Sequence, residues 1–275
     1  MQHEISDNLV IDSGELGTLG VAIGGKILYG KGVAAEVAYI KDVQNDLVKI
    51  FGTTVGLQVL RGIAGSPKGK MYIMPYIPDY QADLGRCNAF ASEPSWDVEG
   101  FFDYEADFWG DNIILRYTHS DWSAGSECAT TGPGSRPEEI LLHEMIHGLR
   151  NLYGVSNTRP LGGWMANYDN EEEFYAILLT NIYMSERGQI RMRADHHGFT
   201  SLSKPEFFLN NPGIFDLVSK LYQQQPALCA NIATVECDFN PLRGFAERTY
   251  EAIGSFIRAK MDPSGGIEAQ RRTSR

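Results

Sequence analysis

The sequence HEMIH at residues 143–147 constrains the fold and the chemistry of this chain more than any other stretch. Apolar residues recur around it at helical spacing, which predicts a helix. Two histidines four residues apart on a helix lie one turn along the axis and about 40° apart around it. His143 and His147 can therefore reach one metal ion, and neutral imidazoles suit Zn²⁺. Glu144, adjacent but off the ligand line, can accept a proton from a water on that ion.

The start of this helix is specified locally. Residues 135–138, SRPE, have the pattern of a capping box with Ser135 as the N-cap and proline in the first turn. The pattern predicts a helix from there through Arg150. Its other positions are largely apolar, so one face should be buried, and a buried histidine pair without a metal would carry unsatisfied nitrogens. A pair of core histidines that only hydrogen-bond is the competing interpretation.

Two histidines are an incomplete site, because catalytic zinc usually takes three protein ligands and keeps one position open. A metzincin would place its further histidine at position 153, which here is Tyr153. The alternative is a carboxylate from the next predicted helix, which begins within the sequence YDNEEEF at residues 168–174. A glutamate there would complete a site of the glutamate-zincin type.

Three glutamates compete for this role. If Asp169 is the N-cap, Glu172 occupies the third position of a capping box and is engaged locally. Glu173 is then free to turn inward, and we expect it to be the third ligand, with Glu172 the next candidate. Glu171 is expected to be a solvated charge that complements the helix dipole.

These residues resemble those of the NleD-like family of bacterial effector zinc metallopeptidases and, more remotely, the catalytic domain of anthrax lethal factor. The resemblance rests on residues 140–148 and 170–176, and upstream on 54–60 and 71–73. It covers roughly residues 45–185. Matching the glutamate-bearing strings residue by residue puts the third ligand on Glu173.

The resemblance implies an α+β, zincin-like fold with a small twisted sheet, the HExxH helix and a helical C-terminal portion. It implies one Zn²⁺ held by His143, His147 and Glu173, with Glu144 as the general base. In lethal factor a tyrosine before the glutamate helps to stabilise the oxyanion. Tyr168 precedes Glu173 here at a different spacing, so a catalytic role and a packing role both remain open for it.

The implied activity is zinc-dependent cleavage of a specific protein or peptide substrate, by an effector or toxin acting in a target cell. The first residues lack the basic and apolar regions of a signal peptide, which agrees with secretion by a leaderless route. A cytoplasmic housekeeping metallopeptidase fits the same residues. A third alternative is a catalytically silent, zincin-like binding module that keeps its metal.

The net charge and the hydropathy of the chain limit the classes of partner that we expect. The net charge of −11 opposes binding to a polyanion, so we expect no nucleic-acid partner. No uninterrupted apolar run approaches the roughly 18 residues of a spanning helix, so we expect no membrane insertion.

Hydrophobic periodicity and turn residues predict the remaining layout. We expect one catalytic domain over residues 1–261, a flexible tail over 262–275 and a long surface excursion over 77–111. Strands are predicted within 8–30, 70–76 and 112–118; helices over 33–51, 55–63 and 170–187, with several more beyond, the last capped by Asn240-Pro241.

Cysteines and the other histidines carry weaker signals. The four cysteines are sparse and form no C-x-x-C pair, so we expect reduced structural thiols, with a Cys229–Cys237 bridge as the alternative. His196-His197 is expected to be an ordinary surface pair, because adjacent side chains point apart. His119 is expected to pack in the core or at the rim of the cleft.

Overall fold

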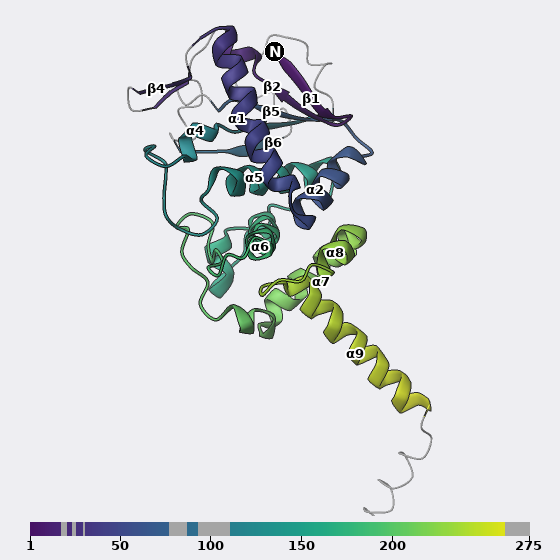
Figure 1. Cartoon of the computed structure of the whole chain (residues 1–275). Coiled ribbons are helices and arrows are strands. Elements are labelled where there is room, and N and C mark those ends of the chain that lie inside the picture. Colours follow the sequence, from purple (N-terminus) through teal and green to yellow (C-terminus); the bar gives the residue numbers. More distant parts are fainter. Residues whose placement is uncertain (18–20, 24–25, 30, 77–86, 93–110, 262–275) are drawn as a thin grey trace, which may run out of the picture.

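The structure is a computed structural model that describes residues 1–275 except 18–20, 24–25, 30, 77–86, 93–110 and 262–275. It is a mixed α+β protein. Figure 1 shows the sheet nearest the N-terminus, α5 beneath the sheet, α6 beyond α5, and α7 to α9 farthest away. The strands are β1 (Gln2–Ser6), β2 (Leu9–Asp12), β3 (Val21–Ile23), β4 (Lys26–Tyr29), β5 (Met71–Met74), β6 (Phe90–Ser92) and β7 (Ile113–Arg116).

The helices account for most of the described chain. The α-helices are α1 (Val33–Phe51), α2 (Thr54–Ala64), α4 (His119–Trp122), α5 (Pro137–Leu152), α6 (Glu171–Glu186), α7 (Pro212–Gln224), α8 (Pro226–Ala233) and α9 (Pro241–Met261). Short 3₁₀ helices are η1 (Gly14–Gly17), η4 (Gly163–Tyr168) and η5 (Pro205–Asn210).

The main sheet has the order β1-β2-β5-β7-β6. The three central strands are parallel, and both edge strands are antiparallel to their neighbours. β5 and β7 are buried along their whole length, as expected for parallel strands covered on both faces. The strands predicted within 70–76 and 112–118 are confirmed, and β3 and β4 form the hairpin expected within 8–30. The edge strands β1 and β6 were not predicted.

The helix predicted over 33–51 is confirmed at both ends, and α2 follows it at a sharp corner. Thr53 caps α2, because its hydroxyl accepts a hydrogen bond from the backbone N–H of Gly56 at 3.0 Å. A Cβ atom on Gly56 would lie 2.0 Å from the carbonyl oxygen of Ile50. The corner therefore needs glycine at that position.

The predicted start of α5 is wrong by one residue. The N-cap is Arg136, whose backbone N–H donates to the Glu139 carboxylate at 3.1 Å. The Ser135 side chain is instead directed at the preceding loop, where its hydroxyl donates to the carbonyl oxygens of Thr130 and Gly132. The capping box is thus displaced along the chain, and the helix still carries the histidine pair.

One connected hydrophobic core runs from Leu9 on β2 to Leu242 at the start of α9. The predicted cap of the last helix is confirmed, since the Asn240 side chain accepts from the Arg243 backbone N–H at 3.2 Å. The tail 262–275 and most of the excursion 77–111 lie outside the described residues. Among the helices that are described, none alone has the length and apolar character to cross a membrane, and only α1 with α2, bent by 113°, meets that test as a pair.

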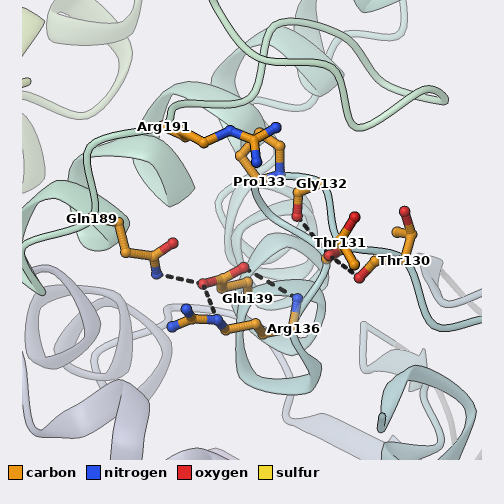
Figure 2. A pocket seen from close by; sticks show the side chains of 9 residues that line it. Thr130, Thr131, Gly132, Pro133, Arg136, Glu139, Gln189 and Arg191 are labelled. Carbon is orange, nitrogen blue, oxygen red and sulfur yellow. Dashed lines mark hydrogen bonds and ion pairs between the residues drawn. The ribbon is translucent and has the colours of Figure 1, made fainter. Parts of the chain in front are cut away.

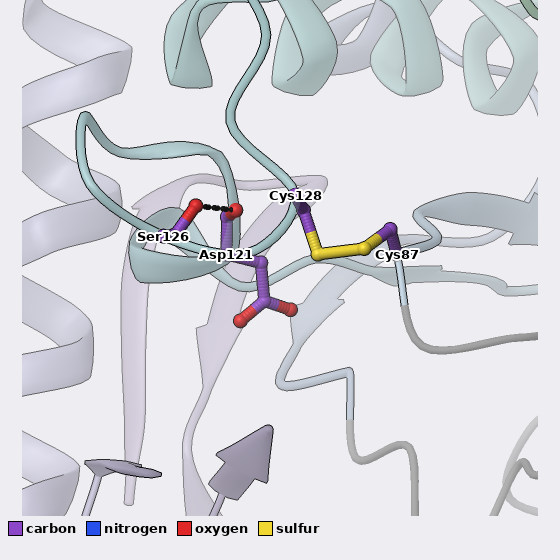
Figure 3. Close-up of a disulfide and its surroundings, with 4 residues drawn as sticks. All are labelled: Cys87, Asp121, Ser126 and Cys128. Atoms are coloured by element: carbon purple, nitrogen blue, oxygen red, sulfur yellow. Dashed lines mark hydrogen bonds between the residues drawn. A yellow bond between two sulfur atoms is a disulfide. The ribbon is translucent and has the colours of Figure 1, made fainter. Parts of the chain in front are cut away.

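A disulfide joins Cys87 to Cys128, with their Cα atoms 5.3 Å apart (Figure 3). The expectation of reduced cysteines is therefore wrong for this pair, and the alternative bridge is wrong as well, because Cys229 and Cys237 are free thiols. The bonded cysteines are distant in sequence. They meet because one lies just before β6 and the other shortly after α4, a long-range approach that spacing alone does not reveal.

Candidate metal centre

His143 and His147 project from the same side of α5, as the helical spacing predicts. Their Nε2 atoms lie 3.1 Å apart and their ring centroids 4.7 Å apart. The His143 side chain is 4% exposed and that of His147 11% exposed. The two nitrogens thus face each other in a largely desolvated space at the interface of α5 and α6.

Glu173 reaches this space from the first turn of α6. Its Oε2 atom lies 3.0 Å from His143 Nε2 and 3.3 Å from His147 Nε2. The N-cap of α6 is Asn170, whose side-chain oxygen accepts from the Glu173 backbone N–H at 3.0 Å. The expectation of Asp169 as the N-cap is therefore wrong, although the side chain expected to turn inward does so.

The other two glutamates of this turn have partners of their own. Arg150 binds Glu172 in bidentate fashion, with Nε–Oε2 and Nη2–Oε1 distances of 2.6 and 2.9 Å. Glu172 is engaged as expected, but by this arginine rather than by a capping box. Glu171 is buried and binds Lys220 of α7 and the Asn157 side chain, so the expectation of a solvated charge is wrong. Glu172 and Glu173 thus both meet α5, at different residues, whereas Glu171 meets α7.

The separations between these donors fit a small divalent cation. A tetrahedral zinc ion with Zn–N and Zn–O bonds of about 2.0–2.1 Å requires its ligand atoms to lie about 3.3 Å from one another. The distances among His143 Nε2, His147 Nε2 and Glu173 Oε2 are 3.0–3.3 Å. Two imidazoles and one carboxylate are also a donor set that zinc prefers. The three predicted ligands could therefore hold this ion together.

His143, His147 and Glu173 form one cluster of donors. Within this cluster one imidazole is neutral, and the other is paired with the Glu173 carboxylate. Burial lowers the pKa of His143 to about 3, so this ring is neutral at physiological pH. Burial also acts to lower the pKa of His147, but the neighbouring Glu173 carboxylate outweighs it and raises that pKa to about 9. Although burial opposes its ionisation, His147 and the hydrogen bonds from both rings hold the pKa of Glu173 far below its usual range.

Glu144 lies beside the cluster and also contacts the sheet. It is 8% exposed, and burial raises the pKa of its carboxyl to about 8. Its carboxylate accepts a hydrogen bond from the backbone N–H of Ala91, in the edge strand β6. A carboxyl with a pKa near the working pH suits a group that takes up a proton and later releases it.

His196 joins the cluster, contrary to the expectation of an ordinary surface residue. Its Nε2 atom lies 3.1 Å from Glu173 Oε2, and its ring stacks parallel to that of His143 with centroids 6.1 Å apart. Its Nδ1 atom lies 2.6 Å from Asp169 Oδ2. The paired histidines in the sequence were the available signal, but the segment that brings them back to α6 has no periodic pattern.

Three other candidates lie away from the donor atoms or at their margin. Tyr168 is buried with its ring edge-on to Phe174, and burial raises its pKa to about 12. These are packing features, so a catalytic role for Tyr168 stays a prediction. His119 binds Asp46 of α1 through Nδ1 at 2.6 Å, which agrees with packing at the core, and His197 is mostly exposed.

A polar pocket of about 300 Å³ lies at the N-terminal end of α5 (Figure 2). Figure 2 shows Glu139 within it, bonded to Gln189 and to the backbone of Arg136, with Arg191 on the opposite side. The buried Glu139 carboxylate pairs with the Arg136 side chain, so it already neutralises positive charge in this pocket. The pocket contains none of the donor residues of the metal cluster.

No family model, curated protein or solved structure matches this chain. The resemblance in the sequence motifs is therefore unsupported by these comparisons. What the chain can do must be argued from the geometry of its own residues.

Proposed function

We propose that this protein is a zinc-dependent endopeptidase in which His143, His147 and Glu173 hold one Zn²⁺. The observation that carries the proposal is the convergence of these three donors, from two helices, at separations that suit the ion. A structural site would need no adjacent carboxyl group outside the donor set. Glu144 supplies such a group, and its contact with an edge strand gives it a place beside an extended substrate.

Zinc, when bound, polarises a scissile carbonyl and lowers the pKa of a nearby water. Glu144 is the group that accepts the proton from that water and delivers it to the leaving amine, so the peptide bond is exchanged for a carboxylate and an amine. The hydrogen bond from Ala91 to the Glu144 carboxylate orients this base. Burial around both histidines excludes bulk water, which strengthens the electrostatic interactions of the site.

The edge strand β6 supports a peptide as the substrate. β6 pairs with β7 on one side, and in the described part of the chain no strand pairs with its other side. Zincin substrates usually lie along an edge strand near the metal, where main-chain hydrogen bonds hold the peptide extended. Such a peptide would run beside the strand that contacts Glu144. Action on a specific protein of a target cell is our proposal for the biological setting.

The test is cleavage by wild-type protein and by Glu144→Gln, which keeps the shape of the side chain and removes its basicity. New N-termini in a treated cell lysate are mapped by mass spectrometry. We expect the variant to lose about 10²- to 10⁴-fold in cleavage rate while it retains about one equivalent of zinc. Glu206→Gln, an exposed substitution of the same kind, should cleave like wild type.

Zinc content separates the peptidase from its alternatives. His143→Ala, His147→Ala and Glu173→Ala should each lose most of the bound zinc. If wild type and Glu144→Gln are equally inert while both retain zinc, the metal-bearing binding module replaces the peptidase. Wild-type zinc content in His143→Ala would overturn the metal centre itself.

A further inference from the structure

The side chain of His196 offers the donor cluster a fourth ligand atom. Its Nε2 lies 3.1 Å from Glu173 Oε2, within the 3.0–3.3 Å range that relates the other donors to that oxygen. His143, Glu173 and His196 each present one ligand atom, and these atoms lie within 4.8 Å of one another. The contact with Glu173 thus has the length expected between two ligands of one ion, and His143 offers its ligand atom close by.

The other ring nitrogen of His196, Nδ1, has the kind of hydrogen-bond partner that orients histidine ligands of metals. His196 Nδ1 lies 2.6 Å from Asp169 Oδ2. A carboxylate at this position accepts the Nδ1 proton and so leaves the Nε2 lone pair available for a cation. Asp169 precedes α6 with a φ of 59°, a conformation that few residues other than glycine adopt. This unusual backbone directs its carboxylate to the ring.

The backbone around His196 is also held in place. Buried Arg193 donates through Nε to the carbonyl oxygen of Asp195 at 2.7 Å, and through Nη2 to that of His196. The His196 backbone N–H donates to the Asn167 carbonyl oxygen at 2.9 Å. Asn181 of α6 bonds both the N–H and the carbonyl group of Arg193. The turn formed by residues 193–197 is therefore held against α6 and η4, and the His196 side chain is directed at the donor cluster.

We propose that His196 is a fourth protein ligand of the metal, one that closes the site in the resting protein and is displaced when substrate binds. Four protein donors complete the tetrahedral sphere that is typical of a closed zinc site, whereas hydrolysis needs an open position. The helical ligands are 4%, 11% and 14% exposed, but the His196 side chain is 28% exposed and lies on a loop. It is the donor that can leave without moving a helix. This inference rests on the metal centre of the proposed function.

His197 provides the matched control. It is the next residue in the same turn, and its Nε2 contacts the same Asp169 oxygen at 2.8 Å, but its side chain is 78% exposed. It contacts Asp169 rather than Glu173. If zinc affinity falls because the turn is generally disturbed, it should fall in both His196→Ala and His197→Ala. If it falls because a ligand is lost, it should fall in His196→Ala alone.

The first measurement is zinc affinity, by competition with a chelator. We expect His196→Ala to bind zinc at least about tenfold more weakly than wild type, and His197→Ala to bind within about twofold of it. His196→Gln, which keeps a polar side chain at the turn, should weaken binding as His196→Ala does. Circular dichroism of the same samples confirms that the compared proteins are folded.

The second measurement is the visible absorption of the Co²⁺-loaded protein, which reports the ligands around the ion. We expect the spectrum to change in His196→Ala and to be unchanged in His197→Ala. Free imidazole added to the Co²⁺-loaded His196→Ala protein should restore the wild-type spectrum, because it supplies the missing donor. This readout does not depend on cleavage.

The inference is overturned if folded His196→Ala and His196→Gln match wild type in both zinc affinity and Co²⁺ spectrum. In that case, loss of zinc from His143→Ala would leave the three-ligand site and the proposed function standing. If His143→Ala itself binds zinc like wild type, the proposed function fails, and the fourth-ligand proposal fails with it.

Discussion

The proposed metal cluster draws its donors from two regions that hold their side chains by different means. In the helix pair α5–α6, the two histidines are placed by helical repeat, and the ion pair between Arg150 and Glu172 joins the helices beside them. In the turn that contains His196, no repeating backbone exists. Individual hydrogen bonds hold it instead. His196 donates from its ring to the Asp169 carboxylate and from its backbone N–H to the Asn167 carbonyl oxygen, and Arg193 donates to the carbonyl oxygens of Asp195 and His196.

The two regions are therefore suited to different roles in metal binding. Donors on two cross-linked helices are suited to permanent ligation, because they cannot move independently. A donor on a turn can be released at the cost of a few hydrogen bonds. The two regions should therefore respond differently when their fastening residues are removed: the helix pair should lose stability, and the turn should lose metal affinity.

The largest effect is expected from Arg150→Met. Arg150 is fully buried and also donates to Gln224, Gln225 and the Val155 carbonyl oxygen, so its loss leaves the Glu172 carboxylate buried without its partner. We expect the free energy of unfolding in urea to fall by about 3–5 kcal/mol. The double variant Arg150→Met/Glu172→Gln should recover part of this loss.

Arg159→Met, at an exposed position, is the matched control and should change the unfolding free energy by less than about 0.5 kcal/mol. A loss below about 1 kcal/mol for Arg150→Met would show that packing alone joins the helices.

A smaller effect is expected from Arg193→Met in the turn. This change removes the guanidinium that donates to two backbone carbonyl groups beside His196, so the ring should lose its fixed direction. We expect zinc affinity to fall by about tenfold, measured by chelator competition. Arg191→Met, an exposed position close by, should bind zinc like wild type. Equal affinities in the two variants would remove the contrast between the regions.

The last effect is expected at Asp121, whose buried carboxyl group has no ion-pair partner among the described residues, unlike Arg150. Both of its carboxylate oxygens are buried, and neither has a hydrogen-bond partner in the part of the chain that the structure describes (Figure 3). Burial raises the pKa of this carboxyl to about 8. From about pH 4 to pH 8 the unfolded chain has released this proton while the folded protein retains it. The unfolded state then binds fewer protons, so stability should fall as pH rises through that window.

Asp121→Asn should therefore melt above wild type at pH 8, by on the order of 10 °C, and the difference should shrink toward pH 4. Thermal melts across this range provide the measurement. Parallel pH profiles for the two proteins would show that Asp121 is ionised in the folded state and carries no such penalty.

The features predicted correctly from the sequence are those set by local chemistry. The apolar repeat over 33–51 fixes both ends of α1, and the spacing of the histidine pair fixes its common side of α5. Glu173 was favoured on a capping argument whose premise is wrong, since the N-cap is Asn170, although its carboxylate does lie beside both histidines. The start of α5 was misplaced because loop carbonyl groups compete for the Ser135 hydroxyl.

The features missed depend on contacts between distant residues. β6 is a three-residue strand in a polar segment, and only its pairing with β7 defines it. The partner of Cys87 depends on that pairing. The paired histidines at 196–197 were the one local signal. It did not point to ligation, because the position of His196 depends on contacts with Arg193, Asn181 and Asp169 that no local pattern predicts.

The Cys87–Cys128 bond ties the segment just before β6 to the rest of the fold. Because Ala91 of β6 donates to Glu144, the support of the proposed base includes a covalent link whose persistence depends on its reduction potential relative to that of the compartment. The same polypeptide thus has an oxidised and a reduced form, which differ in how firmly this edge of the sheet is tethered. Passage between an oxidising and a reducing compartment would convert one into the other.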